Sequence, residues 1–150
     1  MGLSNIIRML TYILLFISIY EGTESIANNN PREGVKKFIS IGVIPTSFLA
    51  AFRHMFLSGQ IIKGGRFFEF EAGGANLGIG IAALVAYLYN MSNQTMGIIF
   101  LIYAVYLFVG AIAWSIYKPK GNMMIWMAKF LSTTAALGYF SYVALTNKDN

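Results

Sequence analysis

Apolar runs of about 20 residues, separated by short polar breaks, constrain the fold of this chain more than any other feature. A helix of that length spans the ~30 Å hydrocarbon layer of a bilayer. Only 11% of the residues are charged, against roughly 25% in soluble domains. The sequence therefore predicts an all-α integral membrane protein, a polytopic helix bundle in which residues 1–150 form a single transmembrane domain. The predicted transmembrane helices are residues 5–27, 37–60, 67–90, 95–117 and 122–145.

The second predicted helix is preceded and interrupted by helix-breaking residues. The polar segment Asn28–Lys37 contains Pro31 and Gly34 and is predicted to be a loop. Within the helix, Pro45 removes one backbone hydrogen bond, so a kink is expected there.

The first predicted helix has a polar stripe, because Thr11, Ser18 and Ser25 recur every seven residues. Small hydroxyl residues are typical of helix interfaces in membranes, so this face is predicted to turn toward protein. Near the end of the helix, Glu21 and Glu24 are level with the basic residues that follow. A bond from these carboxylates to Lys36 or Lys37 is expected to clamp the helix end.

The third run, Arg66–Asn90, is predicted to be the central helix of the bundle because two of its faces carry small residues. At about 100° per residue, one face holds Glu69, Gly73, Asn76, Gly80 and Ala83. The opposite face holds Glu71, Gly74, Ala75, Gly78 and Ala82. A role in helix packing is therefore predicted for Gly73, Gly74, Gly78, Gly80 and Ala82. The fourth run has no charged residue and is predicted to face lipid, so enlarging Gly78 is expected to impair folding more than enlarging Ala104.

Charged and amide side chains inside the predicted spans are informative, because such groups are costly in hydrocarbon and usually have a function. Arg53 and His54 come late in the second span, while Glu69 and Glu71 come early in the third, so their depths match. A buried polar cluster is predicted from Arg53, His54, Glu69, Glu71, Asn76 and Lys129.

The two glutamates of this cluster lie about 160° apart around their helix and cannot share one partner. Glu71 is expected to be the buried member, with its counter-charge from Arg53 or Lys129. Glu69 is expected nearer the headgroups, where a purely structural role is favoured. The same role is favoured for Lys129, whose long stem can reach the headgroups.

Several kinds of site are not supported by the sequence. The chain has no cysteine and one histidine, so neither a metal nor a cofactor is predicted, and the constellation is too sparse to name an enzymatic reaction. The net charge is +5, but the basic residues are dispersed over loops and helix ends, which does not indicate nucleic-acid binding.

The distribution of basic residues bears on topology. Five helices place the termini on opposite sides of the membrane. The amino-terminal side has Arg8, Lys63, Arg66, Lys118 and Lys120, and the other side has Arg32, Lys36, Lys37 and Lys148. This five-to-four split favours a cytoplasmic amino terminus in a bacterial inner membrane.

Three segments resemble a family of small bacterial multi-pass membrane proteins of unknown function. They are FRHMF at Phe52–Phe56, RFFEFEAGGANLGIGI at Arg66–Ile81, and Lys120-Gly121-Asn122. In that family a histidine in the second helix is followed by a Phe-Glu approach to an Ala-Asn-Leu-Gly segment. The resemblance implies shared roles for His54, Glu71, Asn76 and Asn122, and it implies the membrane fold, but it carries no activity.

Two function classes fit these features best. A non-enzymatic structural or accessory subunit of a membrane assembly is favoured by the small-residue faces and by the lack of any soluble domain. Its expected partners are the lipid bilayer and either other membrane subunits or further copies of the chain. The alternative is a small carrier or channel in which the polar cluster handles protons, ions or a small solute.

Overall fold

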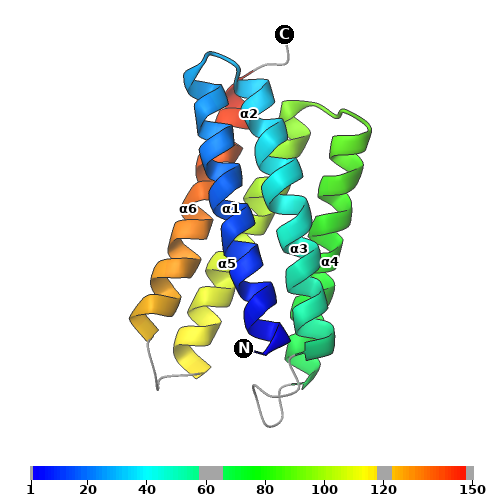
Figure 1. Cartoon of the computed structure of the whole chain (residues 1–150), viewed down its shortest axis with the longest axis vertical. Coiled ribbons are helices and arrows are strands. Elements are labelled where there is room, and N and C mark those ends of the chain that lie inside the picture. The colour runs from blue at the N-terminus through cyan, green and yellow to red at the C-terminus, as the bar shows by residue number, and fades with distance from the viewer. Residues whose placement is uncertain (1, 58–65, 118–122, 148–150) are drawn as a thin grey trace. The chain divides into compact units, whose positions relative to one another are not determined.

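The computed structural model describes residues 2–57, 66–117 and 123–147, and their regular structure is helical throughout. The elements are α1 (Leu3–Ala27), α2 (Pro31–Lys37), η1 (Phe38–Val43), α3 (Ile44–Phe52), η2 (Arg53–Leu57), α4 (Arg66–Leu88), α5 (Asn93–Tyr117) and α6 (Met123–Thr146). The segments η1 and η2 are π-helical. Because α2, η1, α3 and η2 follow one another without a break, they form one long second helix (Figure 1).

The length and composition of the helices indicate an integral membrane protein. Within the described residues, four helices are long and apolar enough to cross a membrane: Leu3–Ala27, Pro31–Leu57, Glu69–Leu88 and Asn93–Ala113. The predicted all-α membrane class is therefore supported. The segments 58–65 and 118–122 lie outside the described residues.

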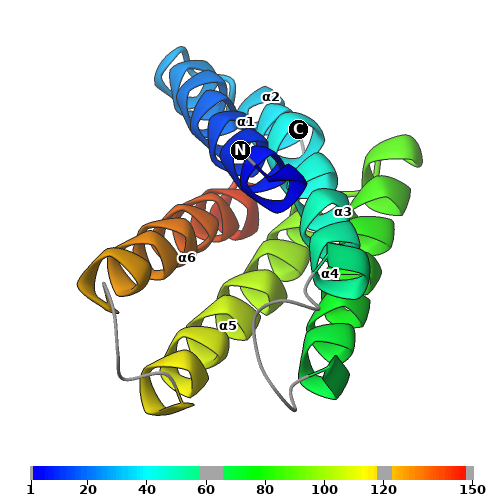
Figure 2. The ribbon, with the colours of Figure 1, turned by 60° about the horizontal axis from the view of Figure 1, so that its bottom comes forward.

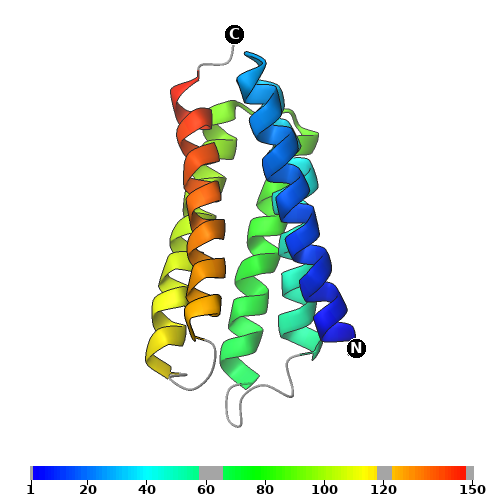
Figure 3. The ribbon, with the colours of Figure 1, turned by 60° about the vertical axis from the view of Figure 1, so that its left-hand side comes forward.

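The chain divides into two compact units, Met1–Met91 and Ser92–Asn150. In the first, the second helix contacts α1 along one side and α4 along the other, so it is the middle helix of the three (Figure 2). The middle position predicted for the third run is thus taken by the second helix within this unit. In the second unit, α5 and α6 pack side by side (Figure 3).

The second helix begins at Pro31, so the predicted loop over Asn28–Lys37 is confirmed only for Asn28–Asn30 and is wrong for the rest. The Asn30 side chain caps the helix by accepting a hydrogen bond from the backbone N–H of Glu33 at 3.2 Å. Proline is favoured at the first helical position because its missing N–H has no partner there anyway, and Glu33 complements the helix dipole. The same proline that indicated a loop therefore starts a helix.

Asparagines reverse the chain after α1 and α4. Asn29 and Asn90 have the positive φ values of 62° and 49° that place them in the left-handed region. The N–H of the residue after each donates 2.9 Å back to the carbonyl five positions earlier, the long bond of a Schellman motif. Asparagine tolerates this conformation better than most residues with a side chain, which explains why the helices end there.

The distortion expected at Pro45 appears as the π-helical segment η1, directly before it. A proline ring displaces the carbonyl four residues earlier, and here that residue is Ile41, inside η1. A wider π turn accommodates such a displacement. The second π segment, η2, has no proline, and its first two residues are Arg53 and His54.

Only one small-residue face of α4 is packed. Glu69, Gly73, Asn76, Gly80 and Ala83 are all buried. A Cβ added at Gly73 would collide with the Met55 side chain and lie 3.3 Å from the Ala51 carbonyl oxygen, so α3 and η2 approach closely here.

The opposite face of α4 is open. Gly74, Gly78 and Ala82 are exposed, and a Cβ added at either glycine would meet no atom within 4 Å. In contrast, Ala104 of α5 is buried. The order of tolerance expected for Gly78 and Ala104 is therefore reversed, because among the described residues of the first unit only one of the two small faces has a neighbouring helix.

Glycines also bring α1 against the second helix. A Cβ at Gly34 would lie 2.6 Å from the Gly22 carbonyl oxygen, and one at Gly42 would collide with the Ser18 hydroxyl. Ser18 and Ser25 are buried and Thr11 is half-buried, which confirms that this stripe of α1 faces protein.

The α5–α6 pair has a close seam of its own. The Ser141 hydroxyl donates to the Gly97 carbonyl at 2.9 Å, and a Cβ at Gly97 would lie 3.0 Å from the Ala144 Cβ. On α5, Ile102 and Val109 are each 57% exposed, and such exposed apolar side chains are expected on the side of a helix that faces lipid.

Candidate functional site

Three side chains of the predicted polar cluster are in direct contact where η2 meets α4. Glu69 Oε2 lies 2.5 Å from His54 Nδ1, and Arg53 Nη2 lies 3.0 Å from His54 Nε2. The Glu69 side chain is only 5% exposed and that of His54 is 20% exposed. The result is a linear arrangement, Arg53–His54–Glu69, which we call the imidazole relay.

The chemistry of arginine fixes the tautomer of His54. A guanidinium has N–H donors and no acceptor, so His54 Nε2 must accept the hydrogen bond from Arg53. The proton of the neutral ring is then on Nδ1, from which it is donated to the Glu69 carboxylate. The relay thus carries one positive charge at Arg53, a neutral ring between, and one negative charge at Glu69.

Helix α1 brings two more polar side chains to the relay. Arg8 and Tyr12 are four residues apart on one face of α1, which contacts η2. Both interact electrostatically with Arg53. Arg8 also acts electrostatically on His54, so the charges that act on this ring are two guanidinium groups and one buried carboxylate, with an excess of positive charge.

Asn76 continues the polar face of α4 beyond Glu69. It is 4% exposed, and its Nδ2 donates to the Ala72 carbonyl of the same helix at 2.7 Å. Gly73 lies between Glu69 and Asn76 on this face, and its lack of a side chain lets Ala51 of α3 and Met55 of η2 pack closely against α4.

Two predicted members of the cluster lie elsewhere. Glu71 is exposed, so the expectation that it is the buried carboxylate is wrong, and Glu69 takes that position. The reason is geometric: the face of α4 that meets η2 is the one that carries Glu69. Lys129 belongs to α6 in the second unit and is exposed as well.

Sequence reasoning brought Arg53, His54 and Glu69 into one cluster but missed the contribution of Arg8 and Tyr12. Their four-residue spacing on α1, at a depth that matches Arg53, is the signal that indicates them. Asn122, which the family resemblance included, lies outside the described residues.

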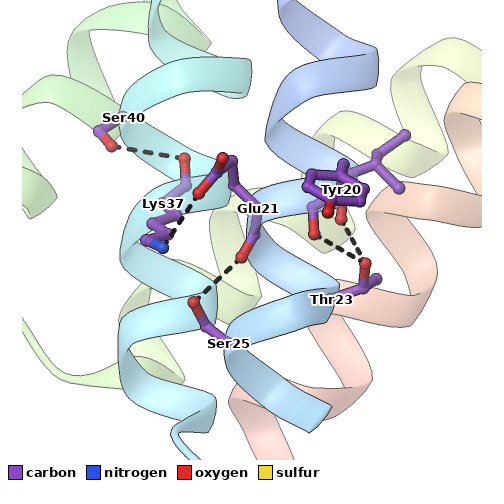
Figure 4. A network of polar contacts seen from close by, with 7 residues as sticks. Tyr20, Glu21, Thr23, Ser25, Lys37 and Ser40 are labelled. Atoms are coloured by element: carbon purple, nitrogen blue, oxygen red, sulfur yellow. Dashed lines mark hydrogen bonds and ion pairs between the residues drawn. The ribbon is translucent and has the colours of Figure 1, made fainter. Parts of the chain in front are cut away.

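An ion pair joins α1 and α2 at the other end of the first unit. Lys37 Nζ lies 3.1 Å from Glu21 Oε2, which confirms the predicted clamp with Lys37 as the partner (Figure 4). The Ser25 hydroxyl donates to the Glu21 backbone carbonyl at 3.0 Å beside it. Both charged side chains are about a third exposed, at 32% and 36%, so water screens their attraction and the pair adds little to stability.

The described residues contain no group of three or more His, Cys, Asp or Glu side chains placed to hold a metal ion. In comparisons with known proteins, no family model, no curated protein and no solved structure matches the chain. The family resemblance based on the FRHMF and FEFEAGGANLG strings stays a prediction. Function must therefore be inferred from the imidazole relay and from the exposed faces of the helices.

Proposed function

We propose that this chain is a non-enzymatic subunit of a membrane assembly, held by five spans in a bacterial inner membrane with its amino terminus in the cytoplasm. The observation that carries the proposal is the open face of α4. Gly74, Gly78 and Ala82 recur every four residues there, the spacing at which membrane helices approach one another most closely.

The composition of this face supports a protein neighbour over lipid. Lipid chains favour bulky apolar side chains, as on the exposed side of α5, whereas small residues leave grooves that another helix fills better. Glu71 lies on the same face and is exposed. A carboxylate on a helix within the bilayer favours a partner that offers hydrogen bonds or a positive charge.

Photo-cross-linking tests for this neighbour. Val85 lies one heptad from Gly78 on the same face and is 38% exposed, so a photoreactive phenylalanine analogue fits there with little disturbance. We expect Val85→photo-phenylalanine to give a discrete protein adduct in cells, whereas Ile102→photo-phenylalanine on α5 should react with lipid. An adduct of twice the chain's mass indicates self-association. Lipid adducts alone at both positions would refute the subunit proposal.

Topology is tested by cysteine labelling, for which a chain without native cysteine is well suited. With five spans, an impermeant thiol reagent should label Ser92→Cys and Lys148→Cys from the opposite side to Lys63→Cys. Pro119→Cys should share the side of the amino terminus. Labelling of Lys63→Cys and Ser92→Cys from one side would remove the third span and with it the five-span arrangement.

A second candidate function, a carrier or channel for protons or ions, is favoured by the imidazole relay. A histidine bonded to a buried carboxylate is a group that can hold and release a proton inside the membrane. Proton flux into liposomes containing the purified chain, abolished by Glu69→Gln and unaffected by Glu71→Gln, would favour this function over the first.

A further inference from the structure

The contact between Arg53 and His54 restricts what His54 can bind. Arg53 Nη2 occupies the lone pair of His54 Nε2 at 3.0 Å. If a proton binds that nitrogen, an N–H of the imidazolium points at an N–H of the guanidinium, and two positive charges are left within hydrogen-bond distance. The nitrogen can therefore hold the proton or the guanidinium, but not both.

We infer that His54 Nε2 is a proton-binding site whose occupation expels the Arg53 side chain from the imidazole relay. The ligand is a single proton from water. The bond formed is Nε2–H, and the bond broken is the hydrogen bond from Arg53 Nη2 to that nitrogen. This inference does not depend on the subunit proposal, and it gives the second candidate function a specific proton site.

The arrangement around Glu69 makes the exchange feasible. His54 Nδ1 stays bonded to Glu69 in both states, because it carries a hydrogen in the neutral tautomer and in the imidazolium. After proton uptake the imidazolium itself balances the Glu69 carboxylate. The buried negative charge therefore keeps a counter-charge throughout, and Arg53 is released from that role.

The groups that face the relay favour the departure of Arg53. On α1, Arg8 repels both the guanidinium and the imidazolium, while Tyr12 offers a hydroxyl that can accept from Arg53. On α4, Glu69 is the carboxylate already bonded to His54. Arg53 comes late in the second predicted span, so its long side chain can extend toward the headgroups.

The π-helical backbone of η2 also fits an exchange. π turns recur at functional sites, and a segment that already departs from α-helical hydrogen bonding can adjust when a side chain moves. Proton uptake at His54 would thus alter the contact between η2 and α1, because Arg53 is the residue of η2 that interacts with both Arg8 and Tyr12.

The test uses the fact that His54 is the only histidine of the chain. In the full chain, labelled with ¹⁵N in histidine and arginine and held in lipid bilayers, NMR reports the ring nitrogens of His54 and the side-chain nitrogens of Arg53. We titrate from about pH 4 to about pH 9, which brackets the usual range of histidine. We expect the Nδ1–H tautomer at high pH, protonation of Nε2 on acidification, and a change in the Arg53 signals with the same midpoint.

Variants separate the exchange from a fixed structural contact. Arg53→Gln removes the competing charge and should raise the proton affinity of His54 about tenfold, whereas Glu69→Gln should lower it by a similar factor. Glu71→Gln is the matched control and should leave the midpoint unchanged. If His54 stays neutral throughout, or protonates while the Arg53 signals do not move, the inference is overturned. The wild-type titration decides this even if a variant fails to fold.

Discussion

Replacing Glu69 by alanine should lower the free energy of unfolding by about 1–3 kcal/mol, because it leaves the half-buried Arg53 guanidinium without the carboxylate that balances it. The His54 Nδ1–H, bonded to Glu69 at 2.5 Å, loses its acceptor at the same time. Unfolding of the chain in mixed micelles, followed by circular dichroism as the fraction of denaturing detergent rises, measures the change.

Glu71→Ala provides a matched control for this measurement. It removes the same side chain two positions along the same helix, from an exposed site, and should change the free energy by no more than about 0.5 kcal/mol. The double change His54→Ala with Glu69→Ala should cost clearly less than the sum of the single changes, since they share one hydrogen bond. Equal effects of Glu69→Ala and Glu71→Ala would contradict the relay.

Gly34→Ala should destabilise the first unit by about 1–3 kcal/mol, even though alanine is the better helix former. The added methyl would lie 2.6 Å from the Gly22 carbonyl oxygen and 2.7 Å from Ile26 Cγ1. A backbone carbonyl cannot move without separating α1 from α2, so the clash cannot be relieved by a rotamer change. The midpoint of thermal unfolding in mild detergent should fall accordingly.

The same substitution at Gly74 should have the opposite sign in the purified chain. Nothing lies within 4 Å of a Cβ there, so only the helix propensity of alanine acts, and it stabilises by up to about 1 kcal/mol. A loss of stability at Gly74 equal to that at Gly34 would show that the open face of α4 is covered within the chain itself.

Much of the fold follows from the sequence because the composition and length of each segment alone predict a membrane helix. An apolar run of about 20 residues forms a helix wherever a bilayer is its solvent, and that argument needs no knowledge of neighbours. The start of the second helix was predictable as well. Asn30, Pro31 and Glu33 are the cap, the first residue and the acidic first turn of a helix, whereas the composition of the segment alone indicated a loop.

The choice between Glu69 and Glu71 was beyond the reach of the sequence. Both faces of α4 carry small residues, so periodicity alone identified two packing faces without ranking them. The ranking depends on the partner: Ser47 and Phe48 fit over Gly80, and Ala51 and Met55 fit over Gly73. That match is set by the rotation of the second helix, which the π-helical segment η1 changes in a way that the residue pattern does not reveal.

The candidate site was predictable in part for a similar reason. Arg53 and His54 could be matched in depth with the start of α4, because rise per residue is constant along a helix. The direction of each side chain could not be predicted, because the π-helical segment η2 departs from the 100° per residue that a helical wheel assumes.

The π turn of η1 has a further consequence for the evolution of the second helix. Each π turn contains one residue more than an α-helical turn would need. Deleting one residue from Phe38–Val43 would restore regular hydrogen bonding there, yet it would rotate everything downstream by roughly 100°. His54 would then point away from Glu69. Gly73 and Gly80 would no longer face the side chains of the second helix that pack against them. Gain or loss of a single residue upstream of His54 is therefore expected to disrupt the imidazole relay, so this part of the second helix should accept substitutions more readily than changes in length.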